Sequence, residues 1–526
     1  MSPQRPGPSG VSDPAETHQL AFRTAAPAFH TATASGNSPR RPLLFVHVDA
    51  ASEQEKTKPR ARSIKREIRS HVQFHVNEKK RRSGIQQWTR NLRQSAAVAT
   101  SLGRQTIRGI GSGRLDPFET RPVKETPFYR SMMDFYFHDM PAQAPYAYDD
   151  VAVTSPKWAE SLWRVSGFEP VSFFAIIHFV AILYGKLRGV DMTTEVVIWE
   201  QRAHSMVTEF LASGRPISDP IACAVGALAL CASNEGSWEI ADMHYTGLFA
   251  LTHARGGLEA FAPVIQSGLI WCENDYAMRH MTVPAFHQEL SPRSVQQWLE
   301  AFPPELRRQA SLRHQSGQRR LPTVGADLDS ILLSLHHLSI AQEPSWNARM
   351  NRPAMRKTFY DSEHKLLVIL ADSKTRQERS PTLSAAERVR SAVAQTAQLF
   401  LLAALREMPL QTAVNNLLVE RLHTTVSAPG FIDQWIRTAH LHGLLWVLFV
   451  GWAVSTKDSR IVSPRQWFEE HLTQLMWQLD LRYEDLEEVL AQFPSTDAFC
   501  REPRRQLQSR SSVVDETCLV SSESWW

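Results

Sequence analysis

The chain has 526 residues, of which 43% are hydrophobic and 21% charged, so it can bury a large core. Its formal net charge of +4 excludes a histone-like polycation. Five cysteines without a CxxC pair exclude a disulfide framework, zinc fingers and zinc clusters. They indicate a reducing, intracellular environment.

The N-terminal region differs in composition from the rest of the chain. Residues 1–42 contain seven prolines and no apolar run, which predicts a disordered leader without a secretory signal. Residues 43–124 begin with one short extended island at 43–48. They continue as a basic arm and end in a glycine-rich linker around 109–113.

The positive charge is concentrated in this arm. Residues 56–108 hold 15 Lys or Arg and two Glu, a local net charge of +13, so the remaining chain carries −9. The cations that we expect to contact an import receptor or phosphate are Lys65, Arg66, Arg69, Lys79, Lys80, Arg81 and Arg82. The alternative is a solvated linker.

From about residue 125 apolar residues recur at helical spacing, and residues 125–500 are predicted to form an all-α body. Three apolar runs, at Val171–Tyr184, Ile221–Ala232 and Leu444–Val454, are shorter than a bilayer requires and predict buried helices rather than membrane spans. Residues 305–325 and 371–390 are charged and are expected to be surface loops. Residues 501–526 are expected to be a loose polar tail.

Two helices have recognisable ends in the sequence. Ser463, followed by a proline and by Gln466, predicts a helix start with a capping box. A second helix is expected from about Ser237 to Gly256-Gly257, where the first glycine can take the left-handed conformation. Arg255 then lies in the last turn, where a cation complements the exposed carbonyl groups.

A search for catalytic patterns yields no phosphate-binding loop, zinc helix or nucleophile turn. An all-α body can hold paired aspartates that bind magnesium and diphosphate, but the only such pair, Asp149-Asp150, lies in a Pro/Tyr-rich stretch and lacks an acidic residue three positions later. Cys223, Cys231 and His336-His337 fit buried structural positions. We therefore predict no enzyme, no catalytic residue, no metal and no cofactor.

One ordered set of residues resembles the fungal-specific transcription factor domain, the helical regulatory part of zinc-cluster regulators. Its members tend to show H-x-x-G-L, then R-G-G-L, then W-x-x-x-D. The matching residues are His244, Gly247, Leu248, Arg255, Gly256, Gly257, Leu258, Trp271 and Asp275. Packing alone explains a helix that ends at a glycine. We therefore predict a structural role for these motif residues. The alternative is an effector pocket or partner surface near Arg255.

The resemblance implies a nuclear transcriptional regulator with a large multi-helix regulatory domain and a disordered, basic N-terminal arm. No cysteine precedes Cys223, so the chain lacks the zinc cluster through which related activators read DNA. It would act through other regulators or an import receptor, as a homodimer or heterodimer. Any DNA contact by the arm alone would not be sequence-specific. The alternatives are a helical ligand-binding or scaffold protein in the cytoplasm and an enzyme of unrecognised class.

Overall fold

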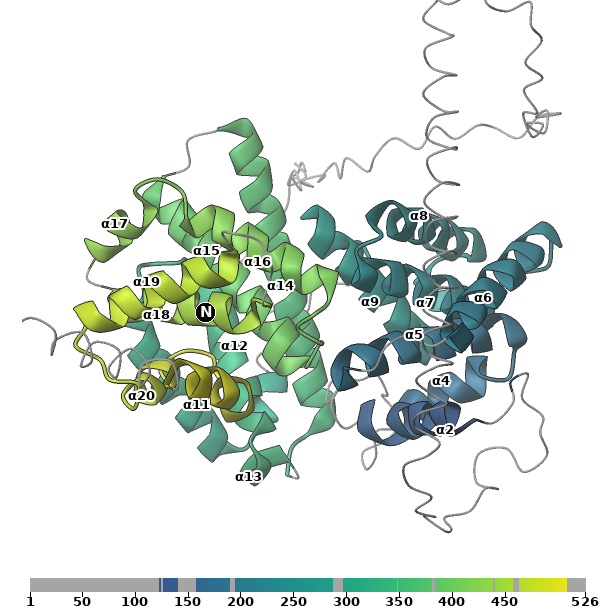
Figure 1. Cartoon of the computed structure of the whole chain (residues 1–526), viewed down its shortest axis with the longest axis horizontal. Coiled ribbons are helices and arrows are strands. Elements are labelled where there is room, and N and C mark those ends of the chain that lie inside the picture. The colour runs from purple at the N-terminus through teal and green to yellow at the C-terminus, as the bar shows by residue number, and fades with distance from the viewer. Residues whose placement is uncertain are drawn as a thin grey trace, which may run out of the picture. The chain divides into compact units, whose positions relative to one another are not determined.

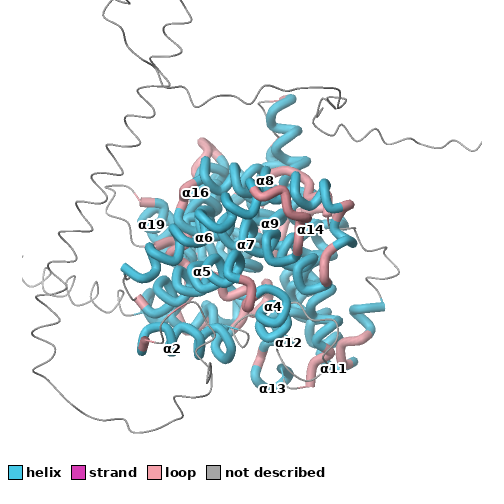
Figure 2. Tube along the Cα trace, turned by 90° about the vertical axis from the view of Figure 1, so that its right-hand side faces the viewer, coloured by secondary structure: helices cyan, strands magenta, loops and turns pink. Residues whose placement is uncertain are grey.

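The computed structural model describes residues 123, 126–140, 158–189, 194–286, 297–347, 349–380, 384–438, 440–456 and 463–508 (Figure 1). Within these ranges every regular element is a helix and no strand occurs, which confirms the predicted all-α class (Figure 2). The leader, the basic arm with Lys65, Arg66, Arg69 and Lys79–Arg82, the island at 43–48 and Asp149-Asp150 lie outside the described residues.

The first group of helices surrounds one buried apolar cluster, which we call the N-terminal core. Its elements are α2 (Pro127–Asp134), η2 (Phe135–Asp139), α4 (Trp158–Ser166), α5 (Pro170–Arg188), α6 (Thr194–Ala212), α7 (Asp219–Glu235), α8 (Trp238–Arg255), η3 (Leu258–Ala260) and α9 (Pro263–His280). Helix α7 packs against α4, α5, α6, α8 and α9, so it is the central helix of this group.

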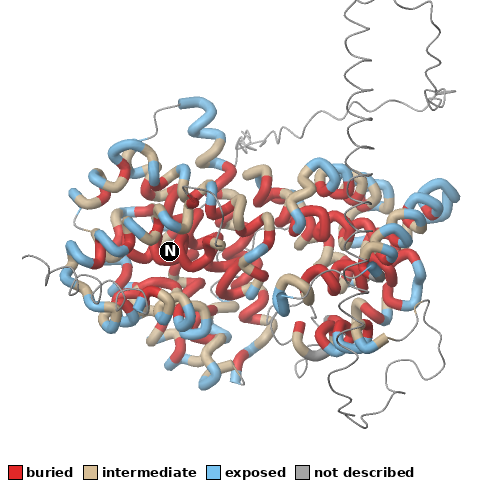
Figure 3. Tube along the Cα trace, viewed as in Figure 1, coloured by how far each residue is buried: buried red, intermediate tan, exposed pale blue. Residues whose placement is uncertain are grey.

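The second group surrounds the C-terminal core, a cluster that includes three fully buried tryptophans, Trp435, Trp446 and Trp452. Its elements are α11 (Pro304–Gln318), α12 (Ala326–Gln342), α13 (Pro344–Asn347), α14 (Arg352–Arg379), α15 (Ala385–Phe400), η4 (Leu401–Leu405), α16 (Ala413–Val426), α17 (Phe431–Ile436), α18 (Leu441–Val454), α19 (Pro464–Gln478) and α20 (Leu486–Leu490). Figure 3 shows buried segments throughout both groups.

The two cores meet along α9. Its residues up to Cys272 belong to the N-terminal core, whereas Ala277 and Met278 belong to the C-terminal core. Helix α14 packs against α9, and α16 packs against α7. Side chains from both groups can therefore line a common site.

The three apolar runs form buried helices, as predicted. Within the described residues, α5 is the one helix whose length and composition would allow it to cross a membrane, but 67% of its most apolar window is buried against other helices. Burial on nearly all sides explains why α5 and α18 are apolar around their whole circumference.

Both predicted helix ends are observed. Gly256 ends α8 with φ of 108°, in the left-handed region. At the start of α19, the Gln466 backbone N–H donates to Ser463 Oγ at 3.3 Å. The capping box is not completed, because the Gln466 side chain donates to Glu470 instead.

Three expectations about loops or tails were wrong in part, although residues 319–325 form a loop as predicted. Residues 304–318 form α11, because Leu306, Ala310 and His314 recur every four residues and bury one face among the charged positions. Residues 371–379 continue α14, where Arg376 and Asp372 pair across one helical turn. Residues 497–508 are helical and Leu507 is buried, so the body extends past residue 500; residues 509–526 lie outside the described part.

Candidate functional site

An apolar cavity of about 130 Å³ lies where the two cores meet. Helices α5, α7 and α9 of the N-terminal core form most of its wall, and Tyr360 of α14 and Arg406 complete it. The larger apolar side chains that line it are Met140, Leu162, Ile176, Phe179, Leu230, Val264, Leu269 and Trp271. An engineered apolar cavity of roughly 150 Å³ stays dry and binds benzene, so this one is large enough for a single-ring molecule.

Two π-helical turns end at the cavity wall. In η2 the Met140 backbone N–H donates to the Phe135 carbonyl, and in η4 the Arg406 N–H donates to the Leu401 carbonyl at 2.9 Å. Met140 and Arg406 both line the cavity. Because π turns are rare and are frequent at functional sites, their coincidence here singles out this cavity from the other surface depressions.

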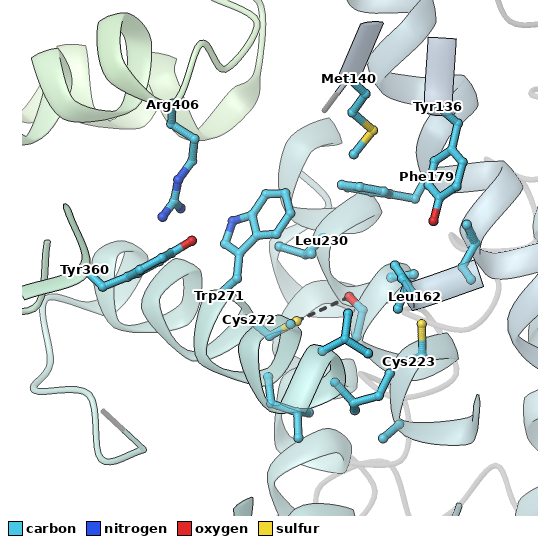
Figure 4. A pocket seen from close by; sticks show the side chains of 18 residues that line it. Tyr136, Met140, Leu162, Phe179, Cys223, Leu230, Trp271, Cys272, Tyr360 and Arg406 are labelled. Atoms are coloured by element: carbon cyan, nitrogen blue, oxygen red, sulfur yellow. Dashed lines mark hydrogen bonds between the residues drawn. The ribbon is translucent and has the colours of Figure 1, made fainter. Parts of the chain in front are cut away.

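Trp271 connects the polar edge of the cavity with its apolar wall (Figure 4). Its ring meets Phe179 edge to face, with centroids 5.9 Å apart. The Arg406 guanidinium carbon lies 5.5 Å from the centre of the same indole ring. Trp271 is the residue of the family-like motif that lines the cavity, and the sequence had predicted only a structural role for it.

The Arg406 charge is neutralised inside the protein. Its Nη2 lies 2.8 Å from Glu363 Oε2, and the Asn274 amide donates to the same oxygen at 2.7 Å. The side chains of Arg406 and Glu363 are only 9% and 6% exposed. A carboxylate ligand would have to compete with Glu363 for the guanidinium, so the cavity favours a neutral molecule.

Two thiols, Cys223 and Cys272, also line the cavity. Burial raises the pKa of Cys223 to about 12 and that of Cys272 well above its ordinary value. Because a neutral thiol is a poor nucleophile, neither side chain is activated for chemistry at neutral pH. Cys272 is buried, whereas Cys223, which was predicted to be buried, is half-buried at the cavity wall.

Arg255 has a structural partner. Its Nη1 lies 2.5 Å from Asp219 Oδ1, and Asp219 Oδ2 accepts the Ala262 backbone N–H at 3.2 Å. The guanidinium also stacks on Phe261, 4.2 Å from the ring centre. Arg255 thus links the start of α7 to the segment that leads into α9, while Gly256, Gly257 and Leu258 form the turn between.

Asp275 joins three helices of the N-terminal core. Its Oδ2 accepts hydrogen bonds from Ser233 Oγ at 2.6 Å and Tyr245 OH at 2.8 Å, and Arg279 Nε lies 3.3 Å away. Burial raises the pKa of Asp275, while Ser233, Arg279 and Tyr245 act in the opposite direction. Asp275 does not line the cavity; it fixes α7, α8 and α9 behind the cavity wall.

His244 faces other histidines rather than the cavity. Its ring centroid lies 5.3 Å from that of His204 on α6, and His204 in turn lies near His178 of α5. Burial lowers the pKa of His178 and of His244 to about 4, so both are neutral at pH 7. Across the described ranges, no group of three or more His, Cys, Asp or Glu side chains could hold a metal ion.

The remaining motif residues of α8 lie on opposite sides of the helix. Leu248 is fully buried in the N-terminal core. A Cβ atom added to Gly247 would meet no other atom within 4 Å, so this glycine faces outward. Packing inside the molecule therefore accounts for Leu248 but not for Gly247.

Sequence reasoning missed most of the cavity wall. Glu363, Tyr360 and Arg406 come from distant segments, and no local pattern links them to α9. One signal was present: the uniformly apolar run 399–405 ends in the charged pair Arg406-Glu407. The basic residues predicted to contact an import receptor or phosphate lie outside the described part, so that prediction stays untested.

Comparisons with known proteins do not identify the chain. No family model matches it, and neither a curated protein nor a solved structure does. The resemblance to the fungal-specific transcription factor domain therefore stays a prediction.

Proposed function

We propose that the helical body binds a small, neutral, apolar molecule in the cavity between its two cores. The observation that carries this proposal is the cavity itself, which is apolar, of single-ring size, and bordered by two π turns. Binding rather than catalysis is the better-supported role, because the two thiols in the wall are neutral and the guanidinium is paired.

We further propose that the chain is a nuclear transcriptional regulator of the fungal-specific transcription factor type without its own zinc cluster. The ordered motif from His244 to Asp275 and the basic arm support this assignment. A ligand that contacts both cores would change how they pack. Its binding energy could thus favour one arrangement of the body over another.

The ligand proposal is tested by titrating the full chain with toluene, followed by calorimetry and thermal unfolding. Toluene should raise the melting temperature, because a ligand at about 100 times its Kd adds roughly 2.7 kcal/mol to the free energy of unfolding. Gly268 lines the cavity and has open space where a Cβ would lie, so Gly268→Leu should fill the cavity and abolish the toluene effect.

A matched control adds the same bulk outside. Thr473→Leu on the exposed face of α19 should leave the toluene response unchanged. A toluene shift that persists in Gly268→Leu would mean that the cavity is not the binding site.

The nuclear assignment is tested separately by imaging the tagged full chain beside a variant with Lys79, Lys80, Arg81 and Arg82 changed to Ala. Nuclear accumulation that is lost in the variant supports a regulator that uses the basic run for import. Cytoplasmic signal from both proteins would favour the second candidate, a ligand-binding or scaffold protein with the same cavity but no transcriptional role.

A further inference from the structure

A second pocket lies in the C-terminal group, where α16, α17, α18 and α19 meet. Its volume is about 330 Å³, within the range of roughly 300–1,000 Å³ that is typical of ligand sites. Helices α18 and α19 pack against each other, and both pack against α16. The pocket shares no lining residue with the cavity between the cores, and in Figure 1 α17, α18 and α19 lie on the side of their group that faces away from α5 and α7.

The pocket has an apolar floor and a polar rim. The fully or almost fully buried residues that line it are Val426, Leu444, Leu448 and Leu475. The exposed polar residues that line it are Ser427, Asp433, Gln474 and Gln478. A bound molecule would therefore place an apolar body against the leucines and a polar group at the rim.

One wall of the pocket is formed by two stacked rings. The centroids of Trp467 and His471 lie 3.9 Å apart. His471 Nδ1 lies 2.9 Å from the Trp467 carbonyl oxygen, which can only accept a hydrogen bond, so Nδ1 carries a proton. In the neutral imidazole the other nitrogen, Nε2, is then an acceptor. The wall thus combines an indole ring, which attracts cations, with an acceptor for an N–H group.

Asp433 supplies the negative charge of the pocket. Among the described residues that line it there is no lysine or arginine. Asp433 lies in the first turn of α17, yet within the part of the chain that the structure describes neither a backbone N–H group nor a cation bonds to its carboxylate. A molecule that covered this carboxylate would remove water from it, and a positive charge on that molecule would offset the loss.

We propose that this pocket binds a small organic cation, whose ammonium group pairs with Asp433 and whose apolar body lies against the leucines of the floor. An arylalkylamine has this chemistry. An anion would be repelled by Asp433, and a neutral molecule of the same shape would cover the carboxylate without pairing with it. This inference does not depend on the cavity between the cores or on nuclear location.

The test is isothermal titration calorimetry of the full chain with phenethylamine, which is protonated at neutral pH, and with phenethyl alcohol, its neutral analogue. Asp433→Asn should weaken phenethylamine binding about tenfold, because it removes the charge that pairs with the ammonium group. The same variant should leave binding of the alcohol unchanged. The matched control is Glu488→Gln on α20, which neutralises an exposed carboxylate outside the pocket and should leave phenethylamine binding unchanged.

A second pair of variants tests the location by bulk. Gln474→Trp should block the rim and abolish phenethylamine binding, whereas Thr473→Trp, at an exposed neighbouring position that does not line the pocket, should not. Gly268→Leu, which fills the cavity between the cores, should have no effect on the amine. Thermal unfolding should verify that every variant is folded. Phenethylamine affinity that is unchanged in Asp433→Asn, or a wild-type Kd for the amine weaker than about 1 mM, would overturn the proposal.

Discussion

Side-chain caps at helix starts are more frequent around the C-terminal core than around the N-terminal core. In the C-terminal group, α14, α15, α16 and α19 each begin with a side chain that accepts a hydrogen bond from the first turn. Those capping residues are Asn351, Ser384, Thr412 and Ser463. In the N-terminal group α2 has such a cap at Thr126, whereas α5, α7, α8 and α9 begin without one.

The N-terminal group replaces local caps with contacts between distant residues. Asp219 at the start of α7 is held by Arg255, and Glu273 accepts the backbone N–H groups of Ala285 and Phe286. The starts of α7 and α9 therefore depend on distant residues, whereas four helices of the C-terminal group carry a local cap; α11, α12 and α18 begin without one. Most of the cavity wall belongs to α5, α7 and α9, which are among the helices that begin without a side-chain cap.

The largest effect is expected where the cores meet. Arg406→Met leaves the buried Glu363 carboxylate without its cation, and such a loss costs about 3–5 kcal/mol. Urea denaturation should report a free energy of unfolding lower by this amount. Because the desolvation cost disappears with both charges, Arg406→Met combined with Glu363→Met should be less destabilised than Arg406→Met alone. Equal loss in both variants would refute the role of the pair.

Acid should act on the N-terminal core through its buried histidines. The pKa of His178 is about 4 in the folded chain against 6.5 when exposed, so the unfolded state binds the proton first. Stability should fall as the pH drops from about 6.5 to 4, by roughly 1.4 kcal/mol per pH unit for each such histidine. Between pH 6 and 5, the slope of the free energy of unfolding against pH reports how many protons the chain takes up on unfolding. His178→Gln should reduce that number by about one, and an unchanged slope would contradict this account.

Matched glycine variants should respond with opposite signs in the two cores. At Gly451 of α18 a Cβ would lie 2.5 Å from Phe468 Cε1, so Gly451→Ala should cost about 1–3 kcal/mol. Gly268→Ala meets only open space and should stabilise the chain by up to roughly 1 kcal/mol. Thermal unfolding of both variants tests the difference in packing, and destabilisation by Gly268→Ala would contradict the open cavity.

The smallest effect concerns the helix ends. Ser463→Ala removes the bond to the Gln466 N–H and should cost about 1 kcal/mol. Ser237 precedes α8 without a capping bond, so Ser237→Ala should change the free energy of unfolding by much less. If urea denaturation showed the same loss in free energy of unfolding for both variants, helices with a side-chain cap and helices without one would not differ in this respect.

Periodicity and capping predicted the parts of the fold that local sequence determines. The apolar runs that became α5, α7 and α18 were identified because burial on all sides requires an apolar circumference. The glycine end of α8 and the serine start of α19 followed from backbone preferences. Residues 304–318 were misjudged because their charged positions conceal the four-residue spacing of Leu306, Ala310 and His314.

The cavity could not be predicted in the same way. Its wall joins Met140, Trp271, Tyr360 and Arg406, which tertiary packing alone brings together. Trp271 was noticed through a family-like motif and given a structural role, whereas Arg406 was not noticed. A cavity forms where side chains from different helices leave a space between them. Local sequence patterns do not determine where such a space remains.

The most direct test of a ligand site between the cores is a crystal structure of the full chain soaked with bromobenzene. The account predicts an anomalous bromine peak inside the cavity, beside Trp271 and Phe179, with the Arg406–Glu363 pair intact. It also predicts no such peak in Gly268→Leu crystals. A wild-type cavity that stays empty while bromobenzene occupies other sites would contradict the central claim.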